Sequence, residues 1–310
     1  MLEPDGGQPQ PPRLAWTSTP PSALDDEGYR AAIGQCVDAI LRMHLGERLV
    51  NKIFGRNLQS HAAGLIVVMH HEALLGLGPR PTLRAIQQEM GHARTLAGFV
   101  ALLRAAGFLA VEPVPHDGRS AYLVPLPPLI DGLRQWLSHH LHCAKTVGLV
   151  PQRSVDRLIA DEVLYRRFLG LSRGLLARTR RVMTGDGAWA WFDRFDCGDR
   201  IALILLHAHH AATTGGRGPR WFDVETRDMA ARLGVSHSHV RSVLNRAEVA
   251  GLVEQDRRLH RIALTDRFLA ESWAWFATFW GWIADLARET EAAGMSELSI
   301  SSPRNRDIGT

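Results

Sequence analysis

Apolar residues recur at intervals of three and four along most of the chain, which predicts a mainly helical protein. In the first half, helices are expected over residues 28–54, 61–75, 83–90, 94–106 and 128–147. In the second half, they are expected over residues 153–183, 200–212, 226–233, 237–250 and 266–292. Asp199 is placed to cap the helix that begins at residue 200. Gly91 and Gly234 each separate two short helices, because glycine adopts the left-handed conformation that ends a helix.

A short β-hairpin is expected after each pair of short helices. Apolar and polar residues suited to strands occupy residues 109–112 and 120–124, and again 252–255 and 261–264. The segment Gly107-Phe108-Leu109 that leads into the first hairpin returns as Gly251-Leu252-Val253, 144 residues further on. This recurrence predicts an internal repeat, so each copy is treated as one unit and the pair as an assembly.

The repeat divides the chain into two predicted units, residues 25–150 and 151–293. Residues 1–24 are rich in proline, glycine and serine, and residues 294–310 end in a polar stretch, so both are predicted to be disordered tails. A chain of 310 residues with 45% hydrophobic content is long enough for two domains that each bury a core.

The sequence also predicts a cytoplasmic location. No apolar run approaches the roughly 20 residues that cross a bilayer, so no membrane association is expected. The first residues lack the basic start and the apolar stretch of a signal peptide. The three cysteines, Cys36, Cys143 and Cys197, are odd in number and form no CxxC pair, as expected for a reducing compartment.

Positive charge is concentrated in the part of the chain that is predicted to fold. The whole chain has a formal net charge of +4, but residues 1–27 carry −4, which leaves +8 on the remainder. A basic body of this kind makes nucleic acid the partner class to consider first.

The second half contains the pattern of a helix that reads DNA. Within residues 237–250, one face carries the apolar residues Val240, Val243, Leu244 and Ala247. The opposite face carries Ser238, Arg241, Ser242 and Asn245, at positions i, i+3, i+4 and i+7. Arginine and asparagine can pair with guanine and adenine edges, and serine can bond a base or a phosphate. A merely solvated helix face is the alternative interpretation.

A basic hairpin tip follows this helix at Asp256-Arg257-Arg258-Leu259-His260-Arg261. Two short helices joined by a glycine turn, the second running into a hairpin, have the element order of a winged helix-turn-helix. In that motif the second helix enters the major groove, and the hairpin tip reaches phosphate or the minor groove. The predicted DNA contacts of this half are Ser236, Ser238, His239, Arg241, Ser242, Asn245, Arg257, Arg258 and Arg261.

These segments resemble the MarR (multiple antibiotic resistance regulator) family of winged-helix transcription factors. In the first half, the resemblance rests on Thr82-Leu83-Arg84-Ala85-Ile86, Leu96, Phe99, Val100, Leu103, Gly107-Phe108-Leu109 and the wing segment Asp117-Gly118-Arg119. In the second half, it rests on Met229-Ala230-Ala231-Arg232-Leu233-Gly234-Val235-Ser236, Val240, Leu244, Gly251-Leu252-Val253 and Asp256-Arg257-Arg258.

The resemblance implies that the helices before and after each wing associate as they do in a dimer of such regulators. The dimer would here form within one chain, through the packing of residues 28–54, 128–147, 153–183 and 266–292. The expected fold class is therefore mainly α with small β-hairpin wings, a single-chain pseudo-dimer of two winged helix-turn-helix units. Members of this family often bind small aromatic effectors, so such a ligand is one partner to consider.

The two predicted reading helices differ in their outward faces. With the 144-residue offset, Ser238, Arg241, Ser242 and Asn245 align with Arg94, Ala97, Gly98 and Ala101. The first copy retains few hydrogen-bonding groups, so it is expected to contact phosphate through Arg94, Thr95 and Arg119. The second copy is expected to dominate base readout.

The resulting prediction is a bacterial, sequence-specific, double-stranded DNA-binding transcriptional regulator that is associated with the nucleoid. The alternative is a winged-helix interaction module that modulates another regulator and binds little DNA itself. Its protein partner would contact the first winged helix, because the small residues Ala97, Gly98 and Ala101 favour close helix packing.

Fifteen histidines raise the further alternative of a metal-dependent enzyme. Pairs that share a helix face are His70-His71, His139 with His142, and His207 with His210, but no HExxH or paired CxxC motif accompanies them. No catalytic constellation is present in the sequence, so neither an enzyme nor a cofactor is predicted. The aromatic residues between Trp273 and Trp282 either line a ligand pocket or, as we expect, are buried between the two halves.

Overall fold

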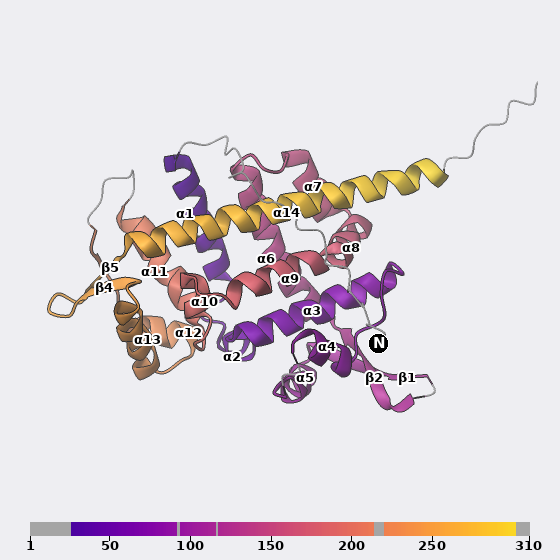
Figure 1. Ribbon diagram of the computed structural model, residues 1–310, viewed down its shortest axis with the longest axis horizontal. Helices are drawn as coiled ribbons and strands as arrows, with labels where there is room; N and C mark the ends of the chain where they lie inside the picture. Colours follow the sequence, from indigo (N-terminus) through magenta and orange to yellow (C-terminus); the bar gives the residue numbers. More distant parts are fainter. Residues whose placement is uncertain (1–25, 92–93, 116, 214–219, 302–310) are drawn as a thin grey trace, which may run out of the picture.

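The computed structural model describes residues 26–91, 94–115, 117–213 and 220–301. This part of the chain is mainly helical and contains two small antiparallel sheets (Figure 1), so the predicted fold class is confirmed at this level. None of its helices is long and apolar enough to cross a membrane. The predicted tail 1–24 lies outside the described residues. Of the second predicted tail, 294–310, residues 294–301 continue the last helix instead of being disordered, and residues 302–310 lie outside the described residues.

The first half runs from a group of helices to a hairpin and one further helix. Its elements are α1 (Asp26–Arg42), α2 (Arg48–Phe54), α3 (Asn57–Leu74), α4 (Leu83–Glu89), α5 (Leu96–Ala105), β1 (Leu109–Val114), β2 (Asp117–Pro125) and α6 (Pro127–Thr146). Thr82 caps α4, because its Oγ1 accepts a hydrogen bond from the backbone N–H of Ala85, 3.2 Å away. Strands β1 and β2 form the expected hairpin, and Thr82 bridges to Tyr122 of β2.

The second half repeats this order with additional helices in front. Its elements are α7 (Gln152–Ala160), α8 (Glu162–Leu171), α9 (Arg173–Met183), α10 (Ala188–Phe192), α11 (Gly198–Ala212), β3 (Phe222–Asp223), α12 (Thr226–Leu233), α13 (His237–Val249), β4 (Val253–Asp256), β5 (Arg261–Leu264) and α14 (Asp266–Ser301). The expected hairpin pairs β4 with β5, and β3 adds a third strand on the other side of β5. The last helix, expected to end at residue 292, continues to Ser301.

The prediction of one long helix over residues 28–54 is wrong. The chain turns after α1, where Gly46 has a φ of 92°. The side-chain amide of Asn51 donates to the carbonyl oxygen of His44, 2.7 Å away, and so holds α2 against the end of α1. Apolar periodicity continues through this break, which is why the sequence alone suggests a single helix.

Two expectations at the start of the second half are also wrong. Residues 153–183 form three helices, with breaks at Asp161 and Ser172. Asp161 is extended, and its carboxylate caps α8 by accepting from two backbone N–H groups. Asp199 does not cap α11. Cys197 occupies the capping position with a φ of 54°, and the carboxylate of Asp199 instead accepts a hydrogen bond from Arg200 at 2.9 Å.

The helices of the two halves are interleaved. Helix α1 of the first half packs on α11 of the second, and α8 of the second half packs on α3 of the first. The helices that follow the hairpins extend this arrangement, since α14 of the second half packs against α6 of the first. In Figure 1, α14 runs along most of the length of the molecule. Much of the apolar surface of each half is therefore buried against the other half.

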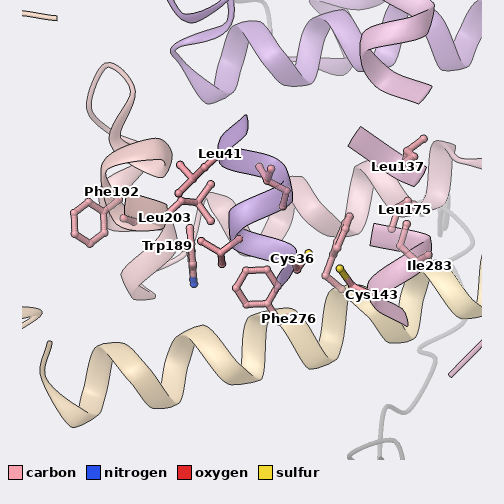
Figure 2. Packing of buried hydrophobic residues seen from close by; sticks show 14 of the residues in the cluster. Cys36, Leu41, Leu137, Cys143, Leu175, Trp189, Phe192, Leu203, Phe276 and Ile283 are labelled. Carbon is pink, nitrogen blue, oxygen red and sulfur yellow. The ribbon is translucent and has the colours of Figure 1, made fainter. Parts of the chain in front are cut away.

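Nearly all buried hydrophobic residues of the described chain form one cluster that spans both halves. Figure 2 shows part of it, where α1, α6 and α14 contribute Cys36, Cys143 and Phe276. Trp280 is completely buried, and its indole N–H donates to Nδ1 of His140 on α6, 3.2 Å away. The prediction that aromatic residues of the last helix are buried is confirmed for Phe276, Phe279, Trp280 and Trp282.

A side chain at Gly198 should be incompatible with the turn into α11. A Cβ there would lie 1.8 Å from the carbonyl oxygen of Phe192, so backbone would have to move. We expect Gly198→Ala to lower the free energy of unfolding by about 2–3 kcal/mol, as at strongly overpacked sites. Urea denaturation followed by circular dichroism provides the measurement.

The matched control is Gly132→Ala in α6, where a Cβ would meet nothing within 4 Å. Alanine is the better helix former, so this variant should gain about 0.5–1 kcal/mol. Equal stability of Gly198→Ala and the wild type would contradict the described turn.

Candidate nucleic-acid interface

Helices α12 and α13 meet at a turn that the local sequence specifies. Gly234 has a φ of 73° and ends α12. Ser236 begins α13, because its Oγ accepts a hydrogen bond from the backbone N–H of His239, 3.1 Å away. The residues predicted to face inward, Val240, Val243, Leu244 and Ala247, are all buried. They hold α13 against the body of the molecule.

The opposite face of α13 is exposed to solvent. It carries the four polar residues that the sequence placed there, Ser238, Arg241, Ser242 and Asn245, which we call the α13 polar strip. Their spacing aligns them along one side of the helix. The strip therefore offers two hydroxyls, a guanidinium and an amide to a single partner surface, and these are groups that read base edges in DNA.

A groove of about 780 Å³ lies between α13, the start of α12 and the β4–β5 hairpin, and Arg241 and Asn245 of the α13 polar strip line it. In Figure 1, this hairpin projects from the molecule beside α13. The basic residues that line the groove are Arg227, Arg241, Arg257, Arg261, His237 and His260. Asp223, Glu225 and Asp256 line it as well, so the groove carries mixed charge with an excess of arginine.

Two of the predicted arginine contacts are paired with acidic residues. The Nε of Arg261 lies 3.3 Å from Oδ1 of Asp223 on β3. Arg257 forms an ion pair with Glu248 near the end of α13. Both guanidinium groups are about half-exposed, so these pairs fix the positions of the side chains without removing them from solvent.

Three other arginines of this surface are exposed and form no ion pair within the described part of the chain. Arg227 lies in the first turn of α12, and Arg241 lies at the centre of the α13 polar strip. Arg258 lies at the hairpin tip, where its backbone N–H donates to Oδ1 of Asp256, 3.0 Å away. These side chains are free to meet an anionic partner. Sequence reasoning missed Arg227, whose only signal was its place at the start of a helix beside the reading helix.

Hydrogen bonds connect the hairpin to α13. The carboxylate of Glu248 accepts from the backbone N–H of Gln255 at 3.2 Å, from its Nε2 at 3.3 Å, and from Arg257. Oδ1 of Asn245 accepts from Nε2 of Gln255 at 3.3 Å and from Nη2 of Arg257 at 3.5 Å. The hydrogen bond from Arg257 holds the pKa of the Glu248 carboxyl below its usual value. Sequence reasoning missed Glu248 and Gln255 as parts of this site.

Two further predicted contacts are engaged within the chain. Ser236 caps α13, and its Oγ also lies 3.0 Å from Oγ of Ser238. The imidazole of His239 is half-buried, and its Nε2 lies 2.9 Å from the carbonyl oxygen of Asp196. His239 thereby connects α13 to the segment that leads into α11. The contacts of Ser236 and His239 with DNA stay predictions.

The first half supports the α12–α13 pair. The backbone N–H of Gly46 donates to the carbonyl oxygen of Arg232 at the end of α12, 3.0 Å away. The side chain of Arg48 packs at Gly234, where an added Cβ would lie 3.3 Å from its Cγ. The orientation of α13 therefore depends on residues from the other half of the chain.

Helix α5, the counterpart of α13 in the first half, presents a different surface. Ala97, Gly98 and Ala101 occupy its outward positions and are exposed, as are Arg94 and Thr95 just before the helix. Gly98 is open, because a Cβ there would meet nothing within 4 Å. Arg119 of β2 is exposed too. The predicted phosphate contacts of this half, Arg94, Thr95 and Arg119, thus all lie at the surface.

A second cavity, of about 410 Å³, lies between α3, the end of α4 and α9. Arg173, Arg180 and Arg181 line it, and Arg173 forms ion pairs with Glu72 and Glu89. The buried aromatic residues of α14 line neither of these two cavities. A small aromatic effector therefore stays a prediction.

The predicted histidine pairs differ in burial, since His71 is buried whereas His142 is exposed. Nδ1 of His71 lies 2.8 Å from the carbonyl oxygen of Val67, and burial lowers its pKa. Burial also lowers the pKa of His140, which lies between the paired His139 and His142, to about 3. Among the described residues, no three histidines, cysteines or acidic residues gather in an arrangement that could hold a metal ion.

Comparison with known proteins adds no assignment. No family model matches the chain, and neither a curated protein nor a solved structure is significantly similar to it.

Asp193 is a half-buried acidic residue close to the segment that anchors His239. Nδ2 of Asn57 donates to its Oδ2 at 2.7 Å, and Asp199 and Arg200 are its charged neighbours. Burial, together with repulsion from Asp199, raises its pKa to about 8. The folded state therefore binds more protons than the unfolded state between about pH 4 and pH 8, so this group makes stability fall as pH rises through that window.

Asp193→Asn keeps an acceptor for Asn57 and removes the ionisable group. We expect its free energy of unfolding to rise relative to that of the wild type as pH increases from about 4 to about 8. Urea denaturation at several pH values measures the difference. The control is Asp186→Asn, because the Asp186 side chain is exposed. A difference between Asp193→Asn and the wild type that does not change with pH would refute the raised pKa.

Proposed function

We propose that this chain is a sequence-specific, double-stranded DNA-binding transcriptional regulator built from two winged helix-turn-helix units. Helices α4 and α5 with the β1–β2 hairpin form the first unit, and α12 and α13 with strands β3–β5 form the second. The interleaved helices around them would make one chain equivalent to a dimer of MarR-like regulators. The repeated element order and the packing of each half on the other support this arrangement.

The observation that carries the proposal is the groove between α13 and the β4–β5 hairpin. A helix fits the major groove of B-DNA, and a hairpin beside it then lies over the sugar–phosphate backbone. Exposed guanidinium groups lie both on the helix and on the elements beside it. Arg241 lies on the helix, whereas Arg258 lies at the hairpin tip and Arg227 at the start of α12. Arg241 would read a guanine edge, and the other two would neutralise phosphates.

The second unit would dominate base readout. The α13 polar strip has hydrogen-bonding groups at every exposed position, whereas the equivalent part of α5 presents Ala97, Gly98 and Ala101. The first unit would contribute phosphate contacts through Arg94, Thr95 and Arg119, which position the protein without reading sequence.

The exposed small-residue face of α5 also favours a second candidate function, an interaction module for another regulator. Ala97, Gly98 and Ala101 are all exposed, and small residues allow a partner helix to approach closely. A chain of this kind would bind little duplex DNA. The experiments below separate the two functions, because they measure DNA binding directly.

Arg241→Ala should weaken specific DNA binding far more than Ala97→Ser. Selection from a randomised duplex library first defines the preferred site, and fluorescence anisotropy then gives the Kd. We expect Arg241→Ala to raise the Kd about tenfold or more, because one bidentate base contact is worth about 1–3 kcal/mol. Ala97→Ser should change the Kd by less than about twofold. Small and equal effects of both substitutions would contradict an asymmetric reader.

Phosphate contacts should make binding depend on salt. With about four phosphates neutralised, by Arg227, Arg258, Arg94 and Arg119, the Kd should rise roughly 150-fold between about 50 and about 200 mM salt. Arg258→Ala should reduce the slope of log Kd against log salt by about 0.9. The control is Arg153→Ala, because this exposed arginine lies on α7, well away from the hairpin in Figure 1. A Kd that is insensitive to salt would argue against the basic surface and for the interaction module.

A further inference from the structure

The side-chain amide of Asn245 is held in one orientation by charged groups of the second unit. Arg257 can only donate hydrogen bonds, so the atom of Asn245 that faces its Nη2 at 3.5 Å must be the oxygen. Glu248 accepts a hydrogen bond from Arg257, and this bond lowers the pKa of its carboxyl, so it is an acceptor at neutral pH. The atom of Gln255 that faces the Glu248 carboxylate at 3.3 Å must therefore be the nitrogen.

The same nitrogen of Gln255 lies 3.3 Å from Oδ1 of Asn245 and donates to it. Oδ1 thus accepts two hydrogen bonds, one from Gln255 and one from Arg257, and a carbonyl oxygen has two lone pairs. Nδ2 of Asn245 has no hydrogen-bond partner in the described part of the chain, and the residue is exposed on the α13 polar strip. The Nδ2 group, a hydrogen-bond donor, is therefore the part of the Asn245 amide that is left for a partner.

We infer that Asn245 reads DNA as a hydrogen-bond donor only, and that Gln255 sets this preference by occupying its oxygen. The inference rests on the proposed function and specifies the base edge that this site takes. The familiar asparagine–adenine pair needs both Oδ1 as an acceptor and Nδ2 as a donor, so Asn245 cannot form it here. Guanine presents two adjacent acceptors, O6 and N7, to the two N–H groups of Nδ2. Asn245 therefore favours guanine over adenine.

Gln255 is a positioning residue, and its effect is distinct from a general stabilisation of the hairpin. Loss of hairpin stability would weaken the binding of every sequence alike. Release of one lone pair on Oδ1 would instead change the preferred base at a single position, because adenine N6 could then donate to it. The ratio of affinities for two duplexes that differ in that one base pair is the readout that separates the two effects.

The test selects preferred sites for the full-length wild type and for Asn245→Ala, which identifies the base pair whose preference depends on Asn245. Duplexes with guanine or adenine at that position are then compared by fluorescence anisotropy for the wild type, Gln255→Leu and Gln255→Met. We expect the wild type to prefer guanine by about fivefold or more, and both Gln255 variants to shift the ratio toward adenine by a similar factor. In the double variant Asn245→Ala with Gln255→Leu, the ratio should be near one.

Several outcomes overturn the inference while the proposed function stands. They are a wild-type preference for adenine at that position, a ratio that both Gln255 variants leave unchanged, and a selected site that Asn245→Ala does not alter. If the wild type enriches no sequence at all, the proposed function fails, and this inference fails with it.

Discussion

The exchange of helices between the two halves is the constraint on which the rest of the molecule depends. Helix α1 buries its apolar face on α11, and α8 buries its face on α3, so each half provides part of the other half's core. Burial of apolar surface is the main favourable term in folding. The two halves are therefore expected to fold together, and the spacing of α5 and α13 is set by shared helices. The backbone hydrogen bond between Gly46 and Arg232 directly connects α12 to the first half.

In each unit, the exposed face of the second short helix can vary independently of its buried face. In α5, the inward residues Leu96, Phe99, Val100 and Leu103 are buried, as are the corresponding residues of α13. The outward faces of α5 and α13 carry different kinds of side chain. Exposed substitutions cost little stability, whereas buried ones cost a great deal, so the two faces of one helix diverge independently. In a homodimer, one substitution alters both reading helices at once. In a single chain, α5 can lose its polar face while α13 retains one.

Features that depend on neighbouring residues were predicted well from the sequence. The pairs of short helices, the hairpins and the exposed side of α13 all follow from spacing and glycine turns, and the described residues confirm them as structure. The breaks at Gly46 and Asp161 could not be predicted, because apolar periodicity continues across them. Glu248 bonds to the hairpin, and His239 bonds to the backbone of Asp196. These hydrogen bonds join separate elements, and the relative positions of those elements are known only from the folded chain. The sequence thus identifies candidate contact residues, but not the orientation of their side chains or the residues to which they bond.

In the proposed DNA complex, the acidic residues in and beside the groove would favour discrimination between sequences over general attraction to DNA. An exposed ion pair contributes only about 0–1 kcal/mol, so Asp223 and Glu248 add little to stability. Their larger effect is to place Arg261 and Arg257 and to offset part of the positive charge beside α13. Non-specific binding depends almost entirely on charge neutralisation, whereas base readout depends on side chains held in fixed geometry. A groove in which some arginines are paired and others are free would lower non-specific binding and preserve base readout. In the proposed complex, the amide of Asn245, held through Gln255 and Arg257, would contribute to base readout in this way.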